Sequence, residues 1–331
     1  MMTFQHNTPT DINISNNKIS PSSNILTLGS CFSQNIGQKL QSSLFKTIVN
    51  PFGTIFNPIS ICNNLDRAIN NKQLNINDIN NLGNRYFHYD FNTSFDSTDS
   101  KSTLEAINTT IYKTHLEIKK VDTLLLTFGT SIVYYLKTQQ DDNDYLVSNC
   151  HKVPSTNFRK EILSVEQMKT KMDNTINQLR KINPDLSIIL TVSPVRHTKE
   201  GLVANSRSKS RLIDLCHVLC EEHQKTEYFP AFEIMIDELR DYRYYKTDMI
   251  HPSDLAIDII WDHFLKNYIS INGQHMIRDL DKLNQASNHK PFDAKSTDYQ
   301  KFKNTQYNKI NSLKEKYPEQ DFSQLETFFK A

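Results

Sequence analysis

The sequence predicts an α/β protein with three layers, α/β/α, built around a mostly parallel sheet and extended by a C-terminal helical tail. Short apolar runs of strand length alternate with longer segments in which apolar residues recur every three or four positions. Several of these runs end in a glycine or a serine–proline turn that leads into the next segment. Strands separated by helices of this length are joined by parallel crossovers, which place helices on both faces of the sheet.

The first strand–turn–helix unit starts with the apolar run 25–28. Phe32, Ile36, Leu40 and Leu44 then form one helical stripe. The other elements of the first half are, in order, a strand at 46–49, a turn at 50–53, a helix over 58–70, an irregular or hairpin segment at 84–95, and a helix opened by the capping pattern Ser102-x-x-Glu105.

The second half opens with the apolar run 121–128, which predicts a strand that ends at Gly129. The elements that follow are a hairpin insertion of 132–136 with 145–147, a helix capped by Ser164-x-x-Gln167, a strand at 186–192, a helix over 206–222, a strand around 228–230, a helix over 255–268, and a tail helix over 299–317 ended by Pro318. We therefore divide the chain into an extension (1–20), one domain (21–285), and a helical tail (286–331) that packs on the domain or on a partner.

Charge and composition exclude several classes of protein. The 38 Lys and Arg residues balance 37 Asp and Glu residues, so there is no electrostatic basis for nucleic acid or an anionic membrane as a partner. The apolar runs are too short to span a bilayer, and the first residues lack the features of a secretory signal, so we expect a cytoplasmic protein. The five cysteines include no CxxC pair, which predicts reduced thiols.

Three of the seven glycines, Gly29, Gly53 and Gly129, fall in turns that follow predicted strands. Ligands of open parallel sheets bind at the carboxyl ends of the strands, where glycine permits tight turns and close backbone approach. The first of these turns places Ser30 and Cys31 at the start of a helix, where backbone N–H groups favour a negative charge. Either residue could act as a nucleophile at such a site.

A base for this nucleophile is offered by the stretch from Asp248 to Ser253. In a turn that leads into a helix, Asp248 can accept a hydrogen bond from Nδ1–H of His251, three residues later. That bond fixes the tautomer in which Nε2 is free to take a serine proton. The residues therefore predict a Ser–His–Asp arrangement assembled from distant parts of the chain.

These motifs, in this order, resemble the SGNH/GDSL hydrolase superfamily and, more narrowly, the GSCFA family. The resemblance covers roughly residues 20–270 and rests on Gly29-Ser30-Cys31-Phe32-Ser33, Asn50-Pro51-Phe52-Gly53 with Asn57-Pro58, Phe128-Gly129-Thr130-Ser131, Asn149-Cys150-His151-Lys152, Ser193-Pro194-Val195-Arg196-His197, and the stretch from Asp248 to Ser253. It implies an SGNH-hydrolase-like fold and an esterase that acts on carbohydrate or other small acyl esters. It implies no metal and no organic cofactor.

The resemblance also implies roles for individual residues: Ser30 as nucleophile, His251 as base and Asp248 as its orienting acid. The oxyanion would rest on the N–H groups of Ser30 and Gly53. Superfamily members usually supply an asparagine side chain after the third glycine, but this chain reads Gly129-Thr130-Ser131. The third donor would then be Ser131 or Asn149, and loss of one donor costs about 2.7–4 kcal/mol of barrier.

The residues also allow alternative interpretations. Ser30 could simply cap its helix, Cys31 could be the nucleophile since a helix N-terminus lowers thiol pKa values, and His251 could be an ordinary capping histidine. An acyltransferase would use the same triad, and a non-catalytic binding module would keep only the pocket.

Several further residues are candidates for substrate binding or for packing. The substrate-binding candidates are His151, Arg196, His197 and Tyr245, the last within a cluster with Tyr242 and Tyr244. Arg196 or His197 would bind an anionic or sugar group. We expect Arg207, Ser208 and Lys209 at a solvated helix start, and Cys216 and Cys220 as buried thiols.

Overall fold

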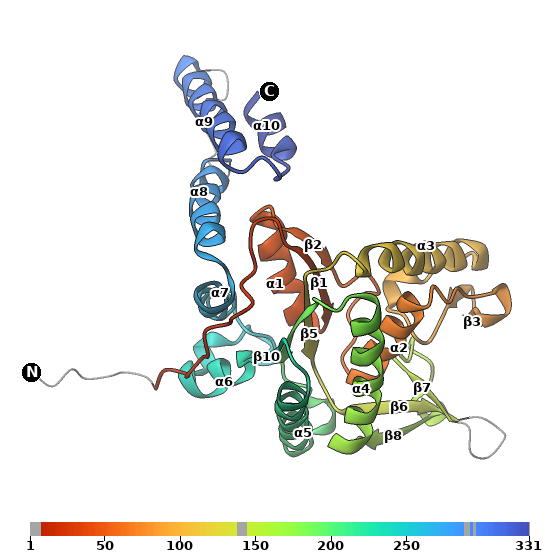
Figure 1. Ribbon diagram of the computed structural model, residues 1–331. Coiled ribbons are helices and arrows are strands. Elements are labelled where there is room, and N and C mark those ends of the chain that lie inside the picture. Colours follow the sequence, from red (N-terminus) through yellow and green to blue (C-terminus); the bar gives the residue numbers. More distant parts are fainter. Residues whose placement is uncertain (1–7, 138–143, 288–291, 294–295, 331) are drawn as a thin grey trace, which may run out of the picture.

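The centre of the protein is a parallel β-sheet flanked by helices (Figure 1). The computed structural model describes residues 8–137, 144–287, 292–293 and 296–330. Within these residues the main sheet has five strands in the order β10-β9-β5-β1-β2, and every neighbouring pair is parallel. The strands are β1 (Asn24–Gly29), β2 (Lys46–Val49), β5 (Thr123–Phe128), β9 (Ser187–Val192) and β10 (Thr226–Phe229). The predicted α/β class with a mostly parallel sheet is confirmed.

Alternate residues of the central strands feed two separate cores, one on each face of the sheet. Leu124 and Leu126 of β5 belong to one cluster and Leu125 to the other, as the two-residue period of a strand requires. The first cluster contains α2 (Pro58–Ile69), α3 (Ser100–Ile118), α4 (Val165–Ile182) and α5 (Leu202–Glu222). The second contains α1 (Cys31–Ser42) and α7 (Asp254–Tyr268). Helices thus cover both faces, as in a three-layer fold.

Three predicted helix boundaries are wrong, and one of them is the start of α5, which is Leu202 rather than residue 206. Helix α3 begins at Ser100, because the carboxylate of Asp99 accepts the backbone N–H of Ser102 at 2.7 Å and is the cap in place of Ser102. Helix α1 ends at Ser42, and Leu44 lies beyond it with a φ of 59°. By contrast, the capping box formed by Ser164 and Gln167 at the start of α4 is confirmed.

Two small antiparallel sheets are inserted between the main strands. One has the order β7-β6-β8, which confirms the predicted hairpin and adds a third strand that the sequence pattern did not reveal. The other is a hairpin whose second strand lies in the segment 84–95 predicted as irregular or hairpin, whereas its first strand precedes that segment. The strands are β6 (Ile132–Leu136), β7 (Tyr145–Val147) and β8 (Phe158–Ile162) in the first sheet, and β3 (Asn80–Leu82) and β4 (Arg85–Phe87) in the second.

The chain ends in the helices α8 (Ile271–Ser287), α9 (Thr297–Lys316) and α10 (Ser323–Lys330), which project to one side of the sheet (Figure 1). Helix α9 matches the predicted tail helix to within two residues at its start, whereas α8 and α10 were not predicted. Tyr317 and Phe322 of this region belong to the same buried cluster as Phe45 of the domain. None of the helices in the described part of the chain is both long and apolar enough for a bilayer crossing.

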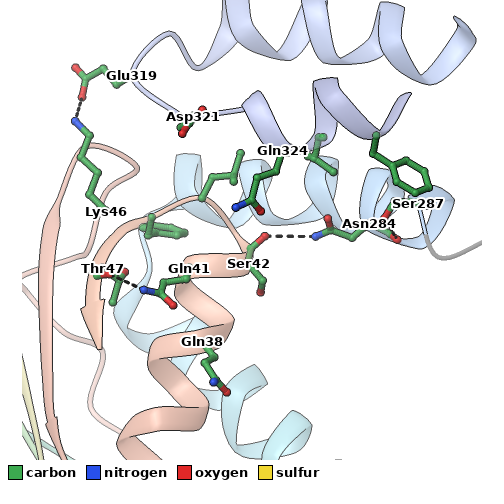
Figure 2. A pocket seen from close by; sticks show the side chains of 14 residues that line it. Gln38, Gln41, Ser42, Lys46, Thr47, Asn284, Ser287, Glu319, Asp321 and Gln324 are labelled. Carbon is green, nitrogen blue, oxygen red and sulfur yellow. Dashed lines mark hydrogen bonds and ion pairs between the residues drawn. The ribbon is translucent and has the colours of Figure 1, made fainter. Parts of the chain in front are cut away.

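A cleft of about 1180 Å³ lies where the last helices approach α1 and β2 (Figure 2). Lys46 forms an ion pair with Glu319 across it at 3.5 Å, and Asn284 donates to the backbone oxygen of Ser42 at 3.4 Å. Most of the residues that line it have polar side chains, among them Gln38 and Gln324 (Figure 2). These contacts connect the C-terminal helices to the domain.

Gly29, the last residue of β1, has a backbone conformation that only glycine adopts easily. Its φ is 137°, and a Cβ added to it would lie 2.1 Å from the backbone oxygen of Thr127. We expect Gly29→Ala to destabilise the protein by about 3 kcal/mol or more, since steric overlap adds to backbone strain. Gly83→Ala is the matched control, because Gly83 also has a positive φ of 66° but open space around it. Urea unfolding should show a clearly larger loss for Gly29→Ala, and equal losses would contradict this explanation.

Candidate active site

The turns that follow β1, β5 and β9 lie next to one another, because these strands are neighbours in the sheet. Backbone hydrogen bonds connect the turns directly. The N–H of Ser30 donates to the oxygen of Thr127 at 3.2 Å, and the N–H of Ser193 donates to the oxygen of Phe128 at 2.8 Å. The carboxyl edge of the sheet therefore brings together the segments that carry the predicted nucleophile and two of the predicted substrate-binding residues, Arg196 and His197.

Ser30 is the N-cap of α1. Its Oγ accepts the backbone N–H of Phe32 at 3.2 Å, and the residue is only 1% exposed. The structure thus shows the capping role considered as an alternative. Among the hydrogen bonds of the described residues, none joins Ser30 to His251.

The adjacent Cys31 is a poorer nucleophile than its position suggests. Burial raises the pKa of the Cys31 thiol, with a smaller opposing effect from a backbone hydrogen bond. A raised pKa leaves less thiolate at neutral pH, and the thiolate is the reactive form. Of the two cysteines on α5, Cys216 is buried as expected, whereas Cys220 is only partly buried. Burial raises the pKa of both thiols.

Asp248 and His251 form the hydrogen-bonded pair that their spacing predicts. Nδ1 of His251 lies 2.7 Å from Oδ2 of Asp248, while Oδ1 accepts the backbone N–H groups of His251 at 3.0 Å and Ile250 at 2.9 Å. These hydrogen bonds, first the one from the His251 backbone, lower the pKa of Asp248 to about 2. An ionised carboxylate can only accept, so Nδ1 carries the proton and Nε2 is left as an acceptor.

The loop that carries this pair is attached to the turn after β9. The N–H of Arg196 donates to the oxygen of Ile250 at 3.2 Å. The guanidinium of Arg196 lies 4.2 Å from the ring centroid of Tyr245, which itself pairs with Pro252 in an isolated bridge. Arg196 and Tyr245, two predicted substrate-binding residues, are thereby placed beside the candidate base.

His197 is a neutral histidine in a confined position. Its Nε2 is buried with no hydrogen-bond partner, and its ring packs edge-on against Phe56 with a centroid distance of 5.2 Å. Burial lowers the pKa of His197 to about 3, helped by the charges of Lys209 and His251. A Cβ added to Gly129 would lie 2.8 Å from this Nε2, so the ring fills the space that the glycine leaves open.

Lys209 is buried, and so is Ser208, so the expectation of a solvated helix start is wrong for both, whereas Arg207 is exposed. Lys209 is 1% exposed and donates from Nζ to the backbone oxygens of Gly129 at 2.7 Å and Ser193 at 2.6 Å. The reason is its place on the helix. Lys209 precedes Leu212 and Cys216 by three and seven residues, so it lies on the buried stripe of α5. That spacing was the signal that could have identified it.

Most of the predicted oxyanion donors already have partners within the protein. The N–H of Ser30 donates to Thr127, and that of Gly53 donates to the oxygen of Asn50 at 2.8 Å. Ser131 is directed towards α5, where its Oγ lies 3.2 Å from Oγ of Ser208. The side-chain oxygen of Asn149 accepts the N–H of His151 at 2.9 Å.

His151 is enclosed in a separate cluster next to the inserted sheets. The residue is 1% exposed, and its ring stacks on Phe87 with a centroid distance of 4.4 Å. Nε2 lies 3.1 Å from the backbone oxygens of His88 and Phe91, and Nδ1 lies 3.1 Å from a carboxylate oxygen of Asp96. Both ring nitrogens are thus engaged by groups of the protein itself.

Asn92 was not identified from the sequence, although it lies against Gly53. A Cβ added to Gly53 would be 2.2 Å from Cβ of Asn92, and Nδ2 of Asn92 contacts Oγ1 of Thr54 at 3.1 Å. Its segment has no motif of its own, so only the folded chain reveals it.

Within the described residues, no group of three or more His, Cys, Asp or Glu side chains is arranged to hold a metal ion.

Comparison with known proteins identifies two matching families. The sequence model of the GSCFA family matches residues 24–264, and that of the GSCFA domain protein, C-terminal domain, matches residues 280–331. The comparison with curated proteins gave no match.

Two solved structures resemble the chain weakly. A proposed platelet activating factor from Streptococcus pneumonia has 13% identity and a TM-score of 0.37, with 75% of this chain and 85% of that chain covered. A carbohydrate esterase family 3 protein from Talaromyces cellulolyticus has 9% identity and a TM-score of 0.33, with 78% and 99% covered. Similarity at this level carries no information on activity or substrate.

Proposed function

The chain belongs to the GSCFA family, and we propose that it is a serine-dependent ester hydrolase of the SGNH type. Ser30 is the nucleophile, His251 the general base, and Asp248 the residue that orients it. The substrate is a carbohydrate ester or another small acyl ester, and the reaction needs no metal or organic cofactor.

The observation that carries this proposal is the pair formed by Asp248 and His251. A carboxylate 2.7 Å from Nδ1 fixes the tautomer and leaves Nε2 unprotonated, which is what a general base requires. Nε2 has no hydrogen-bond partner among the described residues, so it is available to a substrate or a nucleophile. The pair is attached to the turn after β9, on the same sheet edge as Ser30.

In the proposed reaction His251 Nε2 takes the proton of Ser30 as Oγ bonds to the ester carbonyl carbon. The bond to the leaving alcohol then breaks, and the alcohol takes that proton. Water loses a proton to His251 and attacks the acyl carbon. The bond between that carbon and Oγ then breaks, the acid leaves, and His251 returns the proton to Oγ of Ser30. The N–H groups of Ser30 and Gly53, with Ser131 or Asn149, would stabilise the oxyanion after leaving their present partners.

The test is covalent labelling with a fluorophosphonate probe, followed by intact mass and peptide mapping. We expect one adduct per chain, located on Ser30, and its loss in the variant His251→Ala. Ser33→Ala is the matched control, since Ser33 lies in the same turn of α1 and is buried to 0% exposure. A folded wild-type protein that takes no label, or an adduct on Cys31, would contradict the proposal.

A non-catalytic binding module is the second candidate. It is favoured by the lack of a hydrogen bond between Ser30 and His251 and by the internal partners of the Ser30 and Gly53 N–H groups. Such a module would keep the pocket but take no fluorophosphonate label, so the same experiment separates the two functions.

A further inference from the structure

A small pocket lies beside the loop that carries Asp248 and His251, and the catalytic proposal leaves it unassigned. Its volume is about 210 Å³. Arg196, Tyr242 and Tyr245 form one part of its wall, and Arg240, Asp241 and two apolar side chains of the π-helical turn Ile234–Glu238 form the rest. Arg196 and Tyr245, which line this pocket, also lie beside the loop that carries the candidate base.

Arg196 is held in place by aromatic stacking. Its guanidinium carbon lies 4.2 Å from the ring centroid of Tyr245 and 5.4 Å from that of Tyr242. Nη1 also contacts the backbone oxygen of Met249 at 3.4 Å. Stacking on aromatic faces fixes the plane of a guanidinium while its N–H donors stay available for hydrogen bonds.

Arg196 has no carboxylate partner among the described residues, and this sets it apart from the other charges of the pocket. Asp241 accepts the N–H of Arg243 at 2.9 Å and forms an ion pair with its Nε at 3.4 Å, so an arginine outside the pocket compensates it. Arg240 lies 3.8 Å from Asp237, and both are mostly exposed. The pocket therefore carries an excess of positive charge centred on Arg196.

We propose that this pocket is an anion subsite, and that the ester substrate carries a carboxylate or phosphate group that binds the Arg196 guanidinium. The inference rests on the proposed hydrolase function. A guanidinium held over the ring of Tyr245 keeps N–H donors available, and two of them match the two oxygens of such an anion. An uncharged sugar would leave the charge of Arg196 unpaired.

The first experiment measures anion binding without catalysis. Isothermal titration with glutarate, and separately with inorganic phosphate, compares the wild type with Arg196→Gln and Arg196→Lys. We expect the affinity for the anion to fall about tenfold or more in Arg196→Gln and by less in Arg196→Lys. A lysine keeps the positive charge but lacks the paired N–H donors of a guanidinium. Arg278→Gln, an exposed arginine on α8, is the control and should bind as the wild type does. Absence of binding, or equal binding by Arg196→Gln, overturns the subsite. The two titrations show which anion is preferred.

The second experiment compares two esters, the mono-4-nitrophenyl ester of glutaric acid and 4-nitrophenyl butyrate. We expect Arg196→Gln to lower the ratio of kcat/KM for the anionic ester to kcat/KM for the neutral ester about tenfold or more. If Ser30 takes the fluorophosphonate label but neither anion binding nor ester preference depends on Arg196, the subsite fails while the hydrolase stands. If Ser30 takes no label but anion binding depends on Arg196, the hydrolase fails and the subsite stands.

Discussion

Replacing Ser30 with alanine is expected to lower kcat/KM for ester hydrolysis by at least about 10³-fold. The variant has no Oγ to form the acyl intermediate, and removal of a triad serine leaves only the residual catalysis that binding and charge stabilisation provide. The measurement is steady-state hydrolysis of 4-nitrophenyl acetate. The variant Cys31→Ala should lose much less activity, because burial keeps the neighbouring thiol protonated.

The helix cap must be separated from the chemistry, since Oγ of Ser30 also accepts the N–H of Phe32. Ser30→Ala removes the cap and should cost about 1 kcal/mol of stability, whereas Ser30→Gly should cost only a few tenths. If Ser30 is the nucleophile, both variants should be equally inactive. If Ser30 were only a cap, activity would follow stability, and Ser30→Gly would keep most of it.

The sequence was most informative where a local pattern decides the structure. The apolar runs at 25–28 and 186–192 form strands because they are buried on both faces, and an uninterrupted run predicts that position. The hydrogen bond between Asp248 and His251 was predicted from a spacing of three residues and is present at 2.7 Å. In each case the deciding contacts are close in sequence.

The sequence was least informative about contacts between distant segments. Asn92 lies against Gly53, and Oγ of Ser131 is directed at Ser208 rather than at the sheet edge. In both pairs the two residues are far apart in the sequence. The same limit explains why the partner of the Ser30 N–H group, the backbone oxygen of Thr127, was not foreseen. Donor sets of this kind depend on how strands and helices from different parts of the chain meet.

Lys209 shows what such distant contacts do for the candidate site. Its ammonium group binds the oxygen of Gly129 after β5 and that of Ser193 after β9, so one side chain connects two neighbouring turns. Nε2 of His197 lies next to Gly129 as well. Burial lowers the pKa of His197, and the charge of Lys209 lowers it further, so the ring stays neutral. The lysine therefore connects two turns at the edge of the sheet and does not contact Ser30 or His251.

The stability of the protein should rise with pH between about 7 and 10.5 because of Lys209. Burial lowers the pKa of Lys209 to about 7 from its ordinary value of 10.5. Within this window the unfolded chain binds a proton at Lys209 and the folded chain does not, so a rise in pH favours the folded state. Below about pH 7 both states bind the proton, and the folded state then bears the full free-energy cost of burying the ammonium group. A shift from 10.5 to about 7 corresponds to about 5 kcal/mol.

Lys209→Met removes this titration and is the variant that tests it. At pH 7 the change has two opposing effects, because the burial penalty disappears while the oxygens of Gly129 and Ser193 lose a donor, at about 1–3 kcal/mol each. As the pH rises from 7 to 10, only the wild type gains stability, so the variant should lose about 3.5 kcal/mol relative to it. Urea unfolding at pH 7, 8, 9 and 10 measures this difference.

Lys181→Met is the matched control for this series, since Lys181 is an exposed lysine near the end of α4. Its difference from the wild type should not change with pH. A flat difference for Lys209→Met as well would mean that the folded protein binds the proton over the whole range. The two backbone oxygens would then hold an ammonium ion strongly enough to offset its burial, and Lys209 would be a permanent positive charge beneath the candidate site.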